Sequence, residues 1–108
     1  MSKIINKLVE LISEEIEGAE EYAKLANFYK MDRLELARDF ATKAEEELKH
    51  ALCWHEWVVK EIELKKVELK NKGEEVPLKM LVRYEIEHEN FIEEYNEVKR
   101  ELAIYKGQ

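Results

Sequence analysis

The sequence has very little of what tight turns and β-sheets require. Three glycines and one proline occur in 108 residues, so few chain reversals or helix breaks are expected. A sheet would also need more β-branched residues and more turn residues than this chain offers. Because 40% of the residues are charged and the breaks are few, the composition predicts a single all-α domain over residues 1–108, built from long helices.

Other features are also missing. Cys53 is the single cysteine, so no internal disulfide can form; this fits a reducing compartment, and we expect a packed thiol. The chain has no apolar run of membrane-spanning length, and its first residues have no signal-peptide core. The net charge of −7 argues against binding nucleic-acid phosphates and favours cations. These absences predict a cytoplasmic protein with neither membrane nor nucleic acid as a partner.

Helix signals then divide the chain. Three helices are expected, at about residues 2–30, 33–71 and 77–106. Ser2 is a candidate N-cap of the first helix. Asp32, with Glu35 three residues later, has the capping-box arrangement for the second helix. Gly73 suits a helix stop, and Pro77 suits the first turn of the third helix.

Each expected helix carries an apolar line with residues alternately three and four apart, which is typical of helices that pack nearly parallel. The apolar members are Ile5, Leu8, Ile12, Ala19, Tyr22, Ala26 and Tyr29 on the first helix, Ala37, Phe40, Ala44, Ala51, Trp54 and Val58 on the second, and Leu81, Tyr84, Phe91, Tyr95, Val98, Leu102 and Tyr105 on the third. Glu15 interrupts the first line, Glu47 the second and His88 the third. Beyond Ile62 the second helix is rich in lysine and glutamate, and we expect it to extend into solvent.

The two interrupting carboxylates are expected to lie at the same depth. With the first turn centred near Met31, Glu15 precedes the turn by 16 residues and Glu47 follows it by 16, so an antiparallel hairpin places them opposite each other. His50 follows Glu47 by three residues and shares its helix face. A buried carboxylate is costly unless it is paired or bound to metal. Carboxylates with an imidazole suit iron or manganese, so the sequence predicts a metal site.

A second Glu-x-x-His occurs on the third helix, at Glu85 and His88. With the second turn near Glu74, residue 101 would be level with Glu47, and His88 would lie roughly 20 Å away along the axis. This pair is therefore a secondary ligand candidate that would need a kinked helix or a partner chain. One hairpin supplies two glutamates and one histidine, so two hairpins related by a two-fold axis would supply the ligands of a two-metal bundle. The modest core of so short a chain also favours a homodimer or larger homo-oligomer.

The segments from Glu14 to Tyr22 and from Glu45 to His50 resemble the ferritin-like superfamily, in particular its rubrerythrin and encapsulated-ferritin branches. The resemblance covers roughly residues 8–58. It implies long antiparallel helices, a four-helix bundle completed by dimerisation, and a di-iron carboxylate site between two protomers. The third helix lies outside the resemblance.

The resemblance also assigns individual residues. It implies that Glu15, Glu47 and His50 bind metal, with two iron ions per site and manganese as the alternative. It implies a supporting position beside the ligands for Tyr22. Two further acidic residues, Glu14 and Glu17, match positions that help to guide iron in.

Two functions follow as expectations. The resemblance implies oxidation of Fe(II) by oxygen or peroxide, a ferroxidase-type oxidoreductase for iron handling or peroxide detoxification. The alternative is a non-catalytic helical adaptor or assembly protein that retains a ferritin-like shape, in which the carboxylates are satisfied polar groups. His55 is expected to be structural or exposed under either interpretation.

Overall fold

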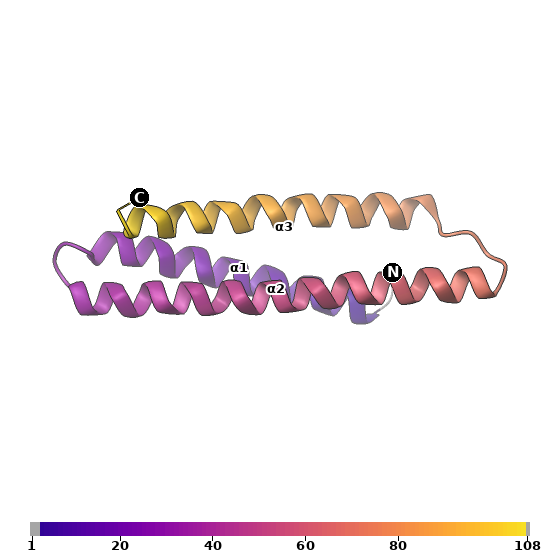
Figure 1. The fold of residues 1–108 in the computed structure, drawn as a ribbon, viewed down its shortest axis with the longest axis horizontal. Coiled ribbons are helices and arrows are strands. Elements are labelled where there is room, and N and C mark those ends of the chain that lie inside the picture. Colours follow the sequence, from indigo (N-terminus) through magenta and orange to yellow (C-terminus); the bar gives the residue numbers. More distant parts are fainter. Residues whose placement is uncertain (1–2, 108) are drawn as a thin grey trace.

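The computed structural model describes residues 3–107, which form three long helices and the connections between them. The helices are α1 (Lys3–Tyr29), α2 (Leu34–Asn71) and α3 (Leu78–Tyr105). They form an elongated bundle of 62 × 18 × 16 Å in which successive helices run in opposite directions (Figure 1). No strand occurs in this part of the chain, so the prediction of three long helices is confirmed. No helix within residues 3–107 is long and apolar enough to cross a membrane.

The helix ends agree with the expected ones to within one residue, but two of the proposed end signals are wrong. Asp32 does not cap α2: the backbone N–H groups of Asp32 and Arg33 both bond to the last carbonyl oxygen of α1, so Asp32 belongs to the turn, and Arg33 is the N-cap without a side-chain bond. Pro77 precedes the first turn of α3 rather than lying in it. Gly73 has a φ of 73° just after α2, as expected of a helix stop. Ser2 lies outside the described residues.

The core lies chiefly between α1 and α2. Ala19, Ala44 and Ala51 have no exposed surface, and such small side chains let the two helices pack closely. Every apolar residue of the three expected lines is buried or half-buried. The expected lines missed further buried residues, which are Ile16, Ala23, Ala41, Leu48, Ile62 and Leu69. The buried face of each helix is wider than a line with two apolar residues per heptad, because α1 and α2 pack against α3 as well as against each other.

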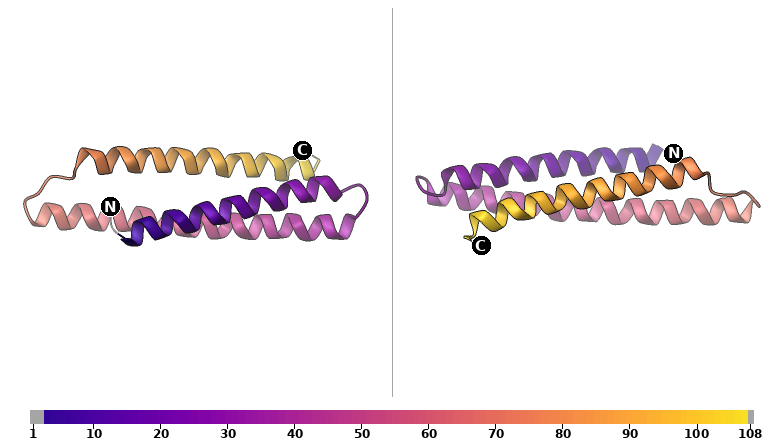
Figure 2. Two further views of the ribbon diagram at one scale, coloured as in Figure 1. Left: turned by 180° about the vertical axis from the view of Figure 1, so that it is seen from behind. Right: turned by 90° about the horizontal axis from the view of Figure 1, so that it is seen from above.

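Helix α3 covers one side of the hairpin and packs more closely on α1 than on α2. Figure 2 shows it along the α1–α2 pair from two further directions. Its buried residues are Phe91, Val98 and Leu102. Near its end, the Asn27 side chain of α1 donates a hydrogen bond to the carbonyl oxygen of Glu101 at 2.8 Å. The sparse contact between α2 and α3 makes this interface the least packed of the three.

The last third of α2 continues past the start of α1 (Figure 1). Leu64 and Val67 are 61% and 55% exposed there, in agreement with the expected extension into solvent. Leu69 differs, because it is buried. The exposed part of α2 is therefore not uniformly polar, and apolar side chains remain on its surface.

Candidate metal centre

Glu15 of α1 and Glu47 and His50 of α2 come together in the structure. Each offers one possible ligand atom, and these atoms all lie within 4.8 Å of one another. Within residues 3–107 no other group of three histidine, cysteine or acidic side chains converges in this way. His50 Nδ1 lies 3.4 Å from Glu15 Oε2. The expectation that the two glutamates face each other across the hairpin, with His50 beside them, agrees with this geometry.

The nearby Glu15 carboxyl group makes the ionisation of Glu47 less favourable. The pKa of Glu47 is raised, first by its hydrogen bond with Glu15, then by burial and by the negative charge of Glu15. A protonated Glu47 can donate this hydrogen bond to a Glu15 oxygen. A bound cation would remove the repulsion between the two carboxylates. Hard carboxylate oxygens and one imidazole are donors that fit iron or manganese, so the residues present suit the metal that the sequence predicts.

The three side chains lie on the face of the hairpin away from α3. The His50 side chain is 58% exposed and that of Glu15 is 21% exposed. His55, five residues further along α2, contacts α3, and five residues correspond to about 140° around a helix. The group formed by Glu15, Glu47 and His50 is therefore open to the surface of the single chain on the His50 side.

Gly18 lies against the Glu47 carboxylate, a contact that the sequence analysis missed. A Cβ atom built at Gly18 would lie 3.5 Å from Glu47 Oε2, with no closer neighbour. A glycine in the middle of a helix is unfavourable for that helix. Its occurrence three residues after Glu15 was the sequence signal that could have indicated this contact. A Cβ atom at position 18 would therefore touch the carboxylate at an ordinary contact distance.

The Gly18→Ala variant is expected to be more stable than the wild-type chain by about 0.5–1 kcal/mol without metal, because alanine favours helix and 3.5 Å is an ordinary contact. Urea unfolding of the metal-free proteins measures this difference. Gly73→Ala serves as the control with the opposite sign, since the φ of 73° disfavours alanine. A loss of stability in Gly18→Ala would mean that Glu47 needs the space in the metal-free protein.

The accessory residues are more scattered. Tyr22 stacks against Phe40 of α2, with 6.1 Å between ring centroids. Glu14 and Glu17 are exposed. Glu17 lies towards α3, where burial raises the pKa of Glu94 and the nearby charges of Glu20 and Glu17 raise it further. The structure therefore does not gather Glu17 with the three candidate ligands.

The third-helix candidates also lie elsewhere. His88 Nδ1 is 2.9 Å from His55 Nε2 of α2, and Glu85 is exposed. Neither belongs to the group formed by Glu15 and the two α2 residues. Burial lowers the pKa of His55, and the nearby His88 lowers it further, so the His55 ring is held neutral. His55 is part-buried, which agrees with a structural role, whereas its pairing with His88 was not anticipated.

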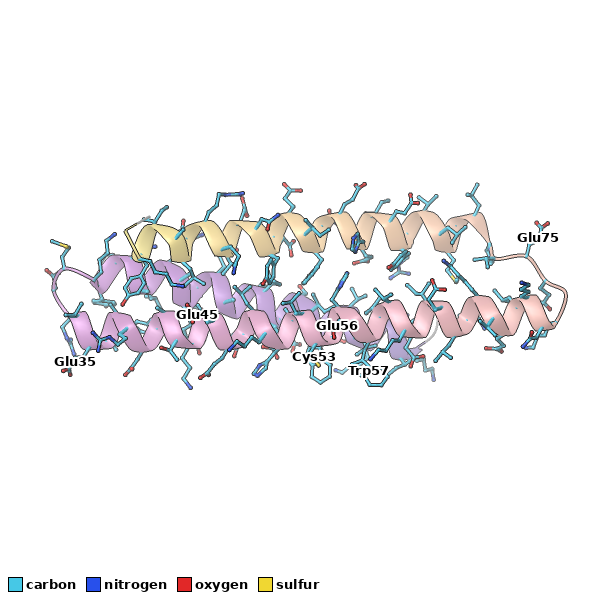
Figure 3. All side chains as sticks on the ribbon, in the orientation of Figure 1. Glu35, Glu45, Cys53, Glu56, Trp57 and Glu75 are labelled. Atoms are coloured by element: carbon cyan, nitrogen blue, oxygen red, sulfur yellow. The ribbon has the colours of Figure 1, made fainter. Side chains whose placement is uncertain are left out.

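Cys53 corrects another expectation, because its thiol is exposed rather than packed. Figure 3 shows Cys53 and Trp57 pointing away from α3. Trp57 is 45% exposed, so this outer face of α2 carries apolar surface near His50. An exposed aromatic side chain of this size is a common feature of interaction surfaces.

Comparison of the chain with protein-family models, with curated proteins and with solved structures gave no match. A function for this chain is therefore inferred from its own residues and their arrangement.

Proposed function

We propose that this chain is a ferritin-like iron protein in which two copies together form a di-iron carboxylate site that oxidises Fe(II). The observation that carries the proposal is the convergence of Glu15, Glu47 and His50 within 4.8 Å. Two glutamates and one histidine from each of two chains equal the ligand set of a di-iron bundle. The three residues come from two helices and lie at matched depth in the hairpin.

The residues of the chain have distinct parts in this proposal. Glu15 and Glu47 would hold the cation through their carboxylate oxygens, whose negative charge would balance that of the ion. His50 contributes a neutral nitrogen from the open side. With Fe(II) as the substrate, two ions would give two electrons to one O₂, which takes up two protons and leaves as hydrogen peroxide. Alternatively, they would give them to one hydrogen peroxide, which takes up two protons and leaves as two water molecules.

The outer face of α2 supports a two-chain site. His50, Trp57 and Leu64 are spaced seven residues apart, so they share one stripe of the helix. Trp57 is 45% exposed and Leu64 is 61% exposed. A second hairpin on this stripe would bury the apolar groups and bring its own ligands to the same place. A non-catalytic adaptor could use the same exposed stripe, and metal retention separates the two functions.

The test is the iron content of the desalted protein after anaerobic loading with Fe(II). The wild-type chain is expected to retain about one iron per chain, which is two per pair of chains, and Glu47→Ala is expected to retain none. Glu46→Ala is the matched control, because Glu46 is an exposed neighbour that pairs with Lys43 on the surface. Iron retention by this control should equal that of the wild type.

Each other outcome has a definite meaning. No retained iron in the wild type would overturn the iron proposal and leave the adaptor. About two irons per chain would mean that one chain holds a complete di-iron site, against the two-chain arrangement. Equal losses in the Glu47 and Glu46 variants would mean that iron binds through general surface charge.

A further inference from the structure

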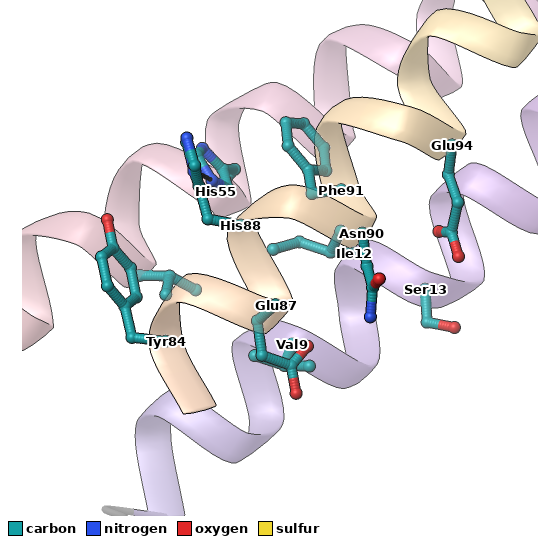
Figure 4. Close-up of a pocket in the computed structure, with 11 residues that line it drawn as sticks. Val9, Ile12, Ser13, His55, Tyr84, Glu87, His88, Asn90, Phe91 and Glu94 are labelled. Atoms are coloured by element: carbon teal, nitrogen blue, oxygen red, sulfur yellow. Dashed lines mark hydrogen bonds between the residues drawn. The ribbon is translucent and has the colours of Figure 1, made fainter. Parts of the chain in front are cut away.

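A second place where metal-binding side chains meet lies on the opposite side of α2. His55 of α2 and His88 of α3 form one wall of a cavity of about 170 Å³ between the three helices. Figure 4 shows the two imidazole rings next to each other, with Tyr84 and Phe91 on either side along α3. The nitrogen atoms His55 Nε2 and His88 Nδ1 are 2.9 Å apart. These rings belong to neither the iron site nor the hydrophobic core.

His55 Nε2 and His88 Nδ1 point directly at each other. The ring centroids are 5.0 Å apart, and the nitrogens 2.9 Å. The centroid distance exceeds the nitrogen distance by 2.1 Å. This is close to the largest excess that two imidazole rings can show, so the two nitrogens must face each other nearly head to head. Phe91 stacks on the His55 ring with centroids 4.2 Å apart and planes 10° from parallel, so one of the two rings is held in place.

The electrostatic surroundings of the pair favour a cation. Glu87 and Glu94 line the same cavity, and no lysine or arginine does. Glu94 also lies near Glu17 and Glu20 of α1, so several carboxylates surround this part of the α1–α3 contact. The carboxylates of the lining lower the electrostatic cost of a cation in this cavity, and no basic side chain of the lining opposes it.

We propose that His55 and His88 bind a divalent ion of borderline softness, such as Zn²⁺ or Ni²⁺, and so link α2 to α3. Imidazole nitrogen suits these ions, whereas the carboxylates of the first site suit harder ones. At a Zn–N distance of 2.0–2.1 Å, nitrogens 2.9 Å apart would subtend about 90° at the ion, and the tetrahedral angle needs a separation of about 3.3 Å. Because Phe91 holds the His55 ring, the His88 ring must move away by about 0.4 Å and tilt, which the loose α2–α3 contact allows.

The two histidines would be the only protein ligands of the ion among the described residues. Within residues 3–107 no third histidine, cysteine or carboxylate converges with the pair, so water would fill the remaining positions. An ion held by two helices binds the folded chain and not the unfolded one, and it therefore raises the unfolding temperature. In the absence of metal, one ring of the pair donates the hydrogen bond and the other accepts it.

The experiment is a Zn²⁺ titration of the full chain by calorimetry, with the unfolding temperature measured in parallel. Zinc is expected to bind and to raise the unfolding temperature of the wild type. Removing a residue that only hydrogen-bonds to a metal ligand typically lowers metal affinity about 10–100-fold. Removing a ligand itself should cost no less, so the zinc affinity of His55→Asn and of His88→Asn should each fall at least tenfold. Glu46→Ala is the control, because Glu46 is exposed and pairs with Lys43, and it should keep both the affinity and the thermal shift. His50→Asn tests separately whether zinc binds at the first site.

The outcomes separate this site from the iron site. Equal zinc binding in wild type, His55→Asn and His88→Asn would overturn the proposal and leave a packing hydrogen bond. Loss of zinc binding only in His50→Asn would assign the zinc to the first site and also overturn it. The circular dichroism of the variants checks that they fold. The imidazole NMR signals of the wild type give an independent readout, because zinc should shift those of His55 and His88 before that of His50.

Discussion

The Glu15→Leu/Glu47→Leu variant is expected to retain no iron, and its metal-free form is expected to be more stable than the wild-type chain at neutral pH. Both carboxylates are half-buried, and the pKa of Glu47 is raised by its contact with Glu15 and by burial. Replacing such groups with apolar side chains removes repulsion and desolvation. Because buried ion pairs replaced in this way gain 1–4 kcal/mol and these groups are partly exposed, a gain of about 1 kcal/mol is expected.

The gain should depend on pH in a defined direction. Since the folded-state pKa of Glu47 lies above its ordinary value of 4.5, the folded chain binds this proton more tightly than the unfolded chain. The wild type is therefore relatively most stable below pH 4.5 and loses this stability as the pH rises through the raised pKa. The advantage of the leucine variant should grow across the same window and then level off. Urea unfolding from about pH 4 to about pH 8 measures it.

The exposed neighbours provide the matched control. In the Glu14→Leu/Glu46→Leu variant the same number of charges is removed from solvent-exposed positions, so the stability should change by no more than about 0.5 kcal/mol, and iron should be retained. The test variant also removes the contact between Glu15 and His50, but the His50 side chain is 58% exposed, and ion pairs with such an exposed partner contribute little to stability. A test variant less stable than the wild type at every pH would show that the two carboxylates are satisfied without a cation.

The helices and the three candidate ligands could be predicted because both depend on local rules. Apolar residues that are alternately three and four positions apart share one helix face, and this does not depend on the rest of the chain. The turn near Met31 is short, so counting residues on either side of it was enough to bring Glu15 opposite Glu47. His50 then followed from helical periodicity alone.

The register of α3 could not be predicted by the same counting. A symmetric turn at Glu74 would place residue 93 level with His55, since each is 19 residues from the turn. The structure pairs His55 with His88 instead. Four residues of the connection, 74–77, are not helical, and at about 3.3 Å per extended residue against 1.5 Å per helical one they carry the chain several residues further along the bundle. The pairing of the two histidines depends on this loop conformation, which composition does not determine.

The Trp57→Glu variant is expected to be monomeric and to lose iron, although Glu15, Glu47 and His50 remain intact. Trp57 is the large apolar side chain on the same stripe as His50, 45% exposed in the single chain and pointing away from α3 (Figure 3). Loss of a central aromatic side chain typically costs an interface about 2 kcal/mol or more, which is roughly thirtyfold in Kd, and a buried carboxylate adds to the cost. Light scattering gives the mass, and anaerobic loading gives the iron content.

The comparison with Ile104→Glu decides whether the effect belongs to the α2 face. Ile104 is a similarly exposed apolar residue, 52% accessible, on α3, so its replacement should leave both the dimer and the iron content unchanged. A monomeric Trp57→Glu chain that still retains about one iron would mean that one hairpin suffices for each ion. A dimeric Trp57→Glu chain would place the interface elsewhere. Simultaneous loss of dimer and iron, in this variant and not in the α3 control, is the result that only a site shared between two α1–α2 hairpins produces.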